Sequence, residues 1–355
     1  MPIPPLYGHE GIRNRLVGAI ASGRLPQALL FEGPQGVGKQ RLALWLAQAL
    51  VCENPSAAGG CGTCQGCRLV LSLSHPDVHW FVPLEPSRSG SADADKQVDL
   101  VREALGEEMA ERREHPLWEP PSGLAIHGIA AVRLLLRELA LKPALGRRKV
   151  FVIGDAERLV PQTGTEAAAN ALLKALEEPP VDTTFVLTTS TPEALLPTVL
   201  SRVVRVRLAR LADSVVTAFV QRELGVTAQR DVAQRVAMAD GRPGRLLADR
   251  DATAGSGGGG GAAERFLAAV EAGPAARYAF ALGQQPFQAR GGFTAMLDGL
   301  LERLRERARS GSETGTAVAA ISRVLRAREL AQGNVNPQLV AAVMADDLGM
   351  AEAGE

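Results

Sequence analysis

The octapeptide GPQGVGKQ, residues 33–40, constrains the fold of this 355-residue chain more than any other stretch. It follows a short apolar run, ALLF at 28–31, and it precedes a segment with helical periodicity. A strand, a glycine-rich loop, a lysine and a helix in this order form the pattern of a phosphate-binding loop. The glycines let backbone N–H groups turn towards phosphate oxygens, and the helix adds its positive N-terminal end. The pattern predicts nucleotide-binding residues at Gly33, Gly36, Gly38 and Lys39.

Further apolar runs predict the rest of a sheet. Each is short and bounded by turn residues, and helical patterns separate one from the next, which favours a parallel α/β sheet covered on both faces. The last run is the most polar, so we expect it at an edge. With ALLF, the predicted strands make a five-stranded sheet within residues 1–208; the further four are 77–82, 149–155, 183–189 and 202–208.

Strand patterns stop near residue 209, and an all-α part follows. Residues 209–252 predict a small helical lid domain, and residues 253–261 contain GSGGGGG, which we expect to be a linker without a regular element. Residues 262–355 predict a C-terminal helical domain. Within it, Leu297, Leu300, Leu301 and Leu304 share one helical face, and core packing is the favoured explanation for that stripe.

One segment of the α/β part fits the alternation poorly. Residues 84–123 form a charged insertion in which Val98, Val101, Leu105 and Met109 recur at helical spacing. Its acidic excess argues against contact with DNA, and we expect a solvated surface helix on a long loop.

Composition excludes some classes of protein. The 39 basic and 39 acidic residues balance, so no attraction of the whole chain to nucleic acid is expected. No apolar run approaches the roughly 18–20 residues that cross a bilayer. The segment MPIPPLYGHE lacks the basic and apolar regions of a secretory signal, so we expect a cytoplasmic location with no membrane partner.

Four cysteines lie in one short stretch, Cys52, Cys61, Cys64 and Cys67, with the spacing C-x8-C-x2-C-x2-C. Four thiolates suit a tetrahedral Zn²⁺ ion, and a closed set of four protein ligands indicates a structural site rather than a catalytic one. An iron–sulfur cluster and reduced free thiols are the alternatives. The zinc module is expected at 52–67.

Two positions argue against nucleotide hydrolysis. Gln40 stands where a serine or threonine hydroxyl normally binds Mg²⁺. The strand predicted at 149–155 ends in Asp155, a candidate metal ligand, but Ala156 stands where many such ATPases carry a glutamate. Glu157 lies one residue further on, so we expect its side chain to point elsewhere. Together these changes predict lost hydrolysis.

The longer runs carry a family resemblance. LYGHEGIRNRLVGAIASGRLPQALLFEGPQGVGK and AAANALLKALEEPPVDTTFVLTTSTPEALLPTVLSRVVRVRL resemble the clamp-loader subunits of bacterial DNA polymerase III, which belong to the AAA+ family. The four-cysteine insertion is found in the same family, and the resemblance covers roughly residues 4–208. It implies an AAA+ P-loop domain, a lid and a C-terminal collar domain that joins other subunits.

The resemblance also implies roles for particular residues. Subunits of the delta prime type have a degraded phosphate loop, and with Gln40 and Ala156 this sequence resembles that type. The Ser-Arg of LPTVLSR implies that Arg202, preceded by Ser201, enters a neighbouring subunit's ATP site as an arginine finger. Thr188 or Thr189 matches the first sensor position, and GRPGR places Arg245 at the second, although a simple helix-start role for Pro243 and Gly244 is equally compatible.

The implied partners are gamma/tau and delta subunits in a hetero-pentamer within the DNA polymerase III holoenzyme, with the sliding clamp and primed DNA reached through the complex. ATP or ADP could occupy the loop without turnover. The main alternative is an active AAA+ ATPase of the gamma/tau motor type. A zinc-dependent DNA binder is a third interpretation, against which the neutral charge and the acidic insertion both argue.

Overall fold

A computed structural model describes residues 3–85, 93–117, 125–146, 148–159, 166–248, 259–284, 290–309, 314–332 and 336–352. The chain divides into two compact units, one of residues 1–119 and 125–247 and one of residues 120–124 and 248–355. Each is described below by itself. No helix among the described residues is long and apolar enough to cross a membrane.

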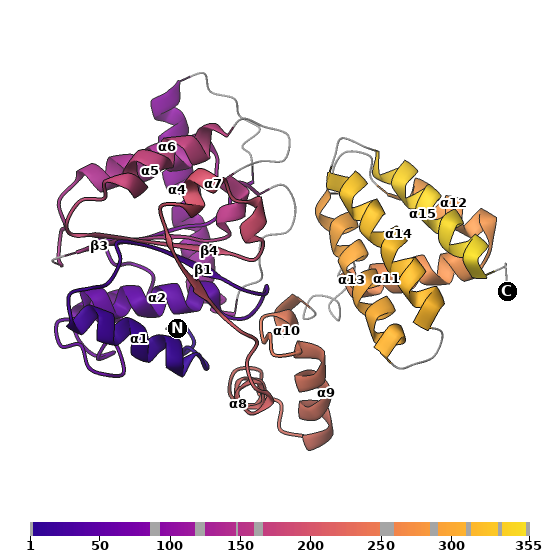
Figure 1. The fold of residues 1–355 in the computed structure, drawn as a ribbon, viewed down its shortest axis with the longest axis horizontal. Helices are drawn as coiled ribbons and strands as arrows, with labels where there is room; N and C mark the ends of the chain where they lie inside the picture. Colours follow the sequence, from indigo (N-terminus) through magenta and orange to yellow (C-terminus); the bar gives the residue numbers. More distant parts are fainter. Residues whose placement is uncertain are drawn as a thin grey trace. The chain divides into compact units, whose positions relative to one another are not determined.

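The first unit is built on a five-stranded parallel sheet with the strand order β2-β3-β4-β1-β5 (Figure 1). The expected number of strands and the edge position of the fifth are therefore confirmed. Three strands, β2, β3 and β5, are shorter than predicted by one or two residues at their ends. The strands are β1 Ala28–Glu32, β2 Val78–Phe81, β3 Lys149–Ile153, β4 Thr183–Thr189 and β5 Val204–Arg207.

Helices cover both faces of this sheet, as the apolar strands require. The helices α1 and α2 lie on one face and α5 and α6 on the other (Figure 1). Every residue of β3 and β4 is buried, and Leu30, Phe31 and Phe151 are fully enclosed. The helices of this α/β part are α1 Glu10–Ala21, α2 Lys39–Val51, α3 Gln65–Leu71, α4 Ala94–Glu114, α5 Ile129–Ala140, α6 Ala167–Glu177 and α7 Pro197–Leu200, with short 3₁₀ turns η1 Ala156–Leu159 and η2 Pro192–Ala194.

The acidic insertion is packed more firmly than expected. Its helix α4 lies against α5, and it buries Val98 and Leu105 in the main core. Arg112 is 2% exposed; its guanidinium lies 4.4 Å from the centre of the Trp80 ring, and its Nε donates to Glu108 over 2.7 Å. The helix therefore has one buried face, and only the opposite face is solvated.

Three short helices complete the first unit after β5: α8 Asp213–Glu223, α9 Gln229–Ala239 and α10 Arg245–Ala248. They enclose a small core of their own around Val216 and Val220. Every described element beyond residue 207 is helical, so the expected change from α/β to all-α is confirmed.

The second unit has a separate helical core. The four leucines of the predicted stripe are all buried there, which supports core packing as their role. One expectation is corrected. A helix begins at Gly259, so residues 259–261 of the predicted linker are helical; the cost of glycine is largest in a helix interior, and these residues lie in the first turn. The helices are α11 Gly259–Glu271, α12 Pro274–Leu282, α13 Arg290–Arg309, α14 Thr314–Gln332 and α15 Pro337–Glu352.

Candidate nucleotide and metal sites

The glycine-rich loop connects the end of β1 to the start of α2, as predicted. Its three glycines all have positive φ angles, and close packing also requires glycine at Gly33 and Gly36, since a Cβ atom at Gly33 would overlap Leu208 O. A Cβ atom at Gly36 would lie 3.1 Å from the backbone nitrogen of Arg245. The backbone before α10 reaches the loop directly, because Gly244 N donates to Gly36 O over 2.9 Å. The loop therefore has the expected shape, and the start of α10 packs against it.

Lys39 is the first residue of α2 and is only 6% exposed. Its ammonium group donates to Gly33 O over 2.9 Å, to Pro34 O over 3.0 Å and to Ser190 Oγ over 2.8 Å. Burial lowers the pKa of Lys39 to about 8, although the negative charges of Asp155 and Glu157 oppose that shift. The lysine that would bind phosphate is thus held by the carbonyl groups of its own loop.

Gln40 lies directly against the end of β3. Its Nε2 donates to Asp155 Oδ2 over 3.1 Å, and its amide lies so close to Gly154 that a Cβ atom there would be 2.9 Å from Nε2. The Oε1 atom of Gln40 is buried and accepts no hydrogen bond from the described residues. The predicted site residues Gln40 and Asp155 are therefore in contact, and the contact is a direct hydrogen bond from the Gln40 amide to the carboxylate.

The carboxyl ends of β3 and β4 bring further polar groups close to Lys39 and Gln40. Thr188 is fully buried, and its Oγ1 accepts from Asp155 N over 3.1 Å, so this hydroxyl fixes the backbone of Asp155. The hydroxyl that reaches Lys39 belongs instead to Ser190, which the sequence reasoning did not select. Its place directly after β4 was the available signal.

The expectation for Glu157 is wrong. The 3₁₀ turn η1 brings the Glu157 carboxylate back to the carboxyl end of β4, where its Oε1 accepts a hydrogen bond from Ser190 N over 3.1 Å. Burial, and next the charge of Asp155, raise the pKa of Glu157. The expectation assumed that the strand continues to residue 157. Asp155 has a φ of 49°, however, so the chain leaves the strand direction at that residue.

The predicted second-sensor residue, Arg245, begins α10 next to the loop. Its backbone position beside Gly36 places it in the neighbourhood of the candidate nucleotide site. The structure therefore brings together Gly33, Gly36, Gly38, Lys39, Gln40, Asp155 and the start of α10.

The predicted finger residue lies apart from these groups, at the end of the single-turn helix α7. The Nε and Nη2 atoms of Arg202 donate to Glu177 Oε1, the former over 2.8 Å. Its Nη1 donates to Thr198 O over 2.6 Å and to Ser201 Oγ over 3.2 Å. The side chain is 28% exposed, so a guanidinium held by three acceptors lies at the surface.

The four cysteines converge between α2 and α3. Their sulfur atoms all lie within 4.8 Å of one another, and the pairs Cys61–Cys67 and Cys52–Cys64 are 3.9 Å apart. A tetrahedral ion with metal–sulfur bonds of ~2.3 Å requires sulfur atoms about 3.8 Å apart. The residues therefore fit a tetrahedral metal ion.

Hydrogen bonds to sulfur support thiolate ligands. Backbone N–H groups donate to three of the sulfur atoms over 3.2–3.4 Å. The Thr63 hydroxyl and the backbone N–H groups of Cys64 and Thr63 lower the pKa of Cys61 to about 6, whereas burial raises that of Cys67. Close packing also sets the module against α2, because a Cβ atom at Gly59 would lie 2.7 Å from the Trp45 ring.

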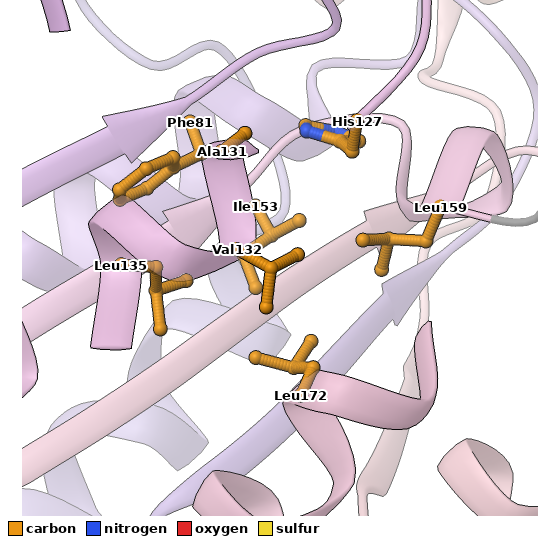
Figure 2. Close-up of a pocket in the computed structure, with 8 residues that line it drawn as sticks. All are labelled: Phe81, His127, Ala131, Val132, Leu135, Ile153, Leu159 and Leu172. Atoms are coloured by element: carbon orange, nitrogen blue, oxygen red, sulfur yellow. The ribbon is translucent and has the colours of Figure 1, made fainter. Parts of the chain in front are cut away.

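A separate pocket lies under α5 and is almost entirely apolar (Figure 2). The one polar residue in its lining, His127, uses Nε2 in a 2.6 Å contact with Gly154 O, and full burial lowers its pKa to about 4. A single buried imidazole whose Nε2 already contacts a carbonyl does not make a phosphate or metal site, and we assign the pocket to core packing. Its lining is Phe81, His127, Ala131, Val132, Leu135, Ile153, Leu159 and Leu172.

Comparisons with known proteins agree with these features. The family model described as DNA polymerase III, delta subunit matches residues 8–212, which are 205 of the 355 residues. The DNA polymerase III subunit delta' of Escherichia coli K12 is 32% identical over 66% of this chain and 58% of its own length. The corresponding subunit of Pseudomonas aeruginosa is 36% identical over 50% of this chain and 42% of its own length.

A subunit of another kind is also similar. The DNA polymerase III subunit gamma/tau of Mycobacterium bovis is 31% identical over 56% of this chain and 27% of its own length. The chain thus spans about half the length of the delta' relatives and less of this one. Because the family model matches more than half of the chain and the delta' subunits are similar across the same region, the chain belongs to the DNA polymerase III delta subunit family, in agreement with the predicted resemblance to its delta prime members.

Proposed function

We propose that this chain is the delta prime subunit of the DNA polymerase III clamp loader. In this role it does not hydrolyse ATP itself, and it lends Arg202 to the ATP site of a neighbouring subunit while a sliding clamp is loaded onto primed DNA. It braces the complex through its C-terminal helical collar domain, next to gamma/tau and delta subunits in a hetero-pentamer. Its place is in the cytoplasm at the replisome, as part of the DNA polymerase III holoenzyme.

The observation that carries the non-hydrolysing role is the hydrogen bond from Gln40 to Asp155. The amide N–H is a donor: it occupies one acceptor position on the Asp155 carboxylate and cannot bind a cation itself, and the amide oxygen lies on a longer side chain than the hydroxyl of serine or threonine. Mg²⁺ demands nearly ideal octahedral geometry at ~2.1 Å, which a plugged site does not provide. Ala156 adds only a buried methyl group at the neighbouring position. Metal-assisted cleavage therefore lacks both the serine or threonine hydroxyl expected at position 40 and the carboxylate usually found at position 156.

Nucleotide binding is a separate matter from turnover. The loop keeps its glycines and Lys39, so ATP or ADP can be held if Lys39 exchanges its bonds to Gly33 and Pro34 for phosphate oxygens. Each exchange replaces a hydrogen bond from the ammonium group to a neutral carbonyl with one to a negatively charged phosphate oxygen, which favours the anion. We propose that any nucleotide bound here is kept intact.

The position of Arg202 supports a role in trans. Its guanidinium lies at the surface and far from the loop in the sequence, at the turn before the edge strand β5. A guanidinium stays charged and binds phosphate oxygens in a forked geometry. An arginine finger supplied by a neighbour is worth ~10³–10⁵ in the rate of phosphoryl transfer.

The metal held by the four cysteines is proposed to be zinc in a purely structural role. The set is closed, with four protein sulfurs and no open position for a substrate. It would fix α3 and the intervening loop to the C-terminal end of α2.

One observation favours the alternative of an active ATPase. Glu157 lies at the candidate nucleotide site with a raised pKa, so a carboxylate is present there after all. It acts as an acceptor for Ser190 N, however, and the Gln40 amide still occupies the metal position. We therefore keep the active motor subunit as the second candidate.

The deciding experiment uses the clamp loader reconstituted with this chain and with its Arg202→Ala variant. The proposal expects no Mg²⁺-dependent ATP turnover by the chain alone. It expects at least a tenfold loss of the loader's DNA-stimulated ATPase on Arg202→Ala, with Arg207→Ala, an exposed arginine of β5, as the matched control. Turnover by the isolated chain that Lys39→Ala abolishes and Arg202→Ala spares would establish the alternative instead.

A further inference from the structure

Glu177 is the last residue of α6, and Glu178 follows it directly. A carboxylate at this end of a helix is repelled by the negative end of the helix dipole, so two in succession are electrostatically unfavourable. A compensating cation is expected, and the structure supplies Arg202, 25 residues further along the chain. The two elements are in contact, because α6 packs against α7.

The contacts of Arg202 fix the plane of its guanidinium. Glu177 Oε1 accepts hydrogen bonds from both Nε and Nη2, while Thr198 O and Ser201 Oγ accept hydrogen bonds from Nη1. A guanidinium has five N–H donors, of which Nη2 carries two. Glu177 is the one partner of Nη2 among these contacts, so at least one N–H of Nη2 remains available to another acceptor.

We propose that Glu177 is the positioning residue for Arg202 and holds the guanidinium in the orientation in which Nη2 meets the nucleotide of the neighbouring subunit. This inference rests on the proposed function, because it requires Arg202 to act as the finger. Glu177 acts through Arg202 and touches no nucleotide. A long arginine side chain loses conformational freedom when it binds, and prior fixation by a carboxylate reduces that loss.

The test compares reconstituted loaders that carry Glu177→Ala, Glu177→Gln or Glu178→Gln in this chain. Glu177→Ala is expected to lower the kcat of DNA-stimulated ATP hydrolysis about tenfold with KM and loader assembly unchanged. Glu177→Gln keeps an oxygen acceptor at the same place and is expected to recover most of that loss. Glu178→Gln, at the exposed neighbour, is the matched control and is expected to be neutral.

A double variant separates positioning from a merely structural role. In the Arg202→Ala background, Glu177→Ala is expected to cause no further loss, because the side chain through which it acts is gone. A tenfold effect of Arg202→Ala together with less than a twofold effect of Glu177→Ala would overturn this inference and leave the proposed function standing. Independent, additive losses would also overturn it. If Arg202→Ala itself changes the rate less than twofold, the proposed function fails and the inference fails with it.

Discussion

Lys39 allows a quantitative test of how the candidate nucleotide site is built. Its pKa is lowered from 10.5 to about 8, chiefly by burial, so the unfolded chain binds this proton more tightly than the folded chain. Stability rises with pH wherever the unfolded state binds more protons. The cost of keeping Lys39 charged, about 3 kcal/mol, is therefore fully present below pH 8 and is relieved as the pH rises from about 8 to 10.5.

The perturbation is Lys39→Met, which keeps an unbranched apolar side chain of similar reach and removes the charged ammonium group. Relative to this variant, the wild-type chain should gain about 2.5 kcal/mol in free energy of unfolding between pH 7 and pH 10. Other titrating groups are common to both chains and cancel in the difference. Urea titrations followed by tryptophan fluorescence suit the measurement, because all three tryptophans precede residue 120 and so report on the first unit.

Lys142→Met is the matched control, since it removes one exposed lysine from the same unit and reports the effect of net charge alone. A wild-type minus Lys39→Met difference that stays constant from pH 7 to pH 10 would refute the burial of a charged Lys39. The lysine would then point into solvent, and the loop would be open to phosphate without any exchange of hydrogen bonds.

Two further predictions concern the metal module and the lid. Cys67→Ser should abolish the binding of one zinc ion per chain, as measured by elemental analysis. It should also lower the melting temperature of the first unit by about 5–10 °C, the shift that about 2–3 kcal/mol produces in a unit of this size. Retention of one zinc per chain would count against a four-cysteine site. Gly244→Ala would place a Cβ atom 2.7 Å from Gly36 Cα, so it should destabilise the packing of the lid on the loop by roughly 2 kcal/mol. Gly106→Ala, in α4 with no atom within 4 Å of the added Cβ, is its control and should be neutral or slightly stabilising; equal melting curves for Gly244→Ala and wild type would contradict the close approach.

Local pattern predicted much of the first unit correctly. Continuous apolar runs such as TTFVLTT can be satisfied only where both faces of a strand are covered, so the parallel sheet followed from residue type alone. The phosphate-loop shape followed from glycine spacing, and the cluster of four cysteines followed from cysteine spacing. These features depend on residues close together in the sequence, which is why sequence reasoning can recover them.

The errors have a different origin. Glu157 was expected to point away, but the turn after Asp155 returns it to the site. The insertion helix α4 was expected to be solvated, but Arg112 is buried against Trp80, more than thirty residues away in the chain. The first outcome depends on the backbone turn at Asp155, and the second depends on which side chains of another element pack against the helix. Local periodicity predicts neither the direction of a turn nor the packing partners of a helix.

The sequence by itself determined the kinds of element, their order and the chemical groups available at each site, because backbone propensity, apolar periodicity and ligand chemistry act over a few neighbouring residues. The tertiary structure alone decided which groups pair: Gln40 with Asp155, Lys39 with Ser190, and Arg202 with Glu177. Such pairs join segments that lie 25 to 151 residues apart. Their formation depends on the packing of whole helices and strands against one another, which places distant side chains within hydrogen-bonding reach.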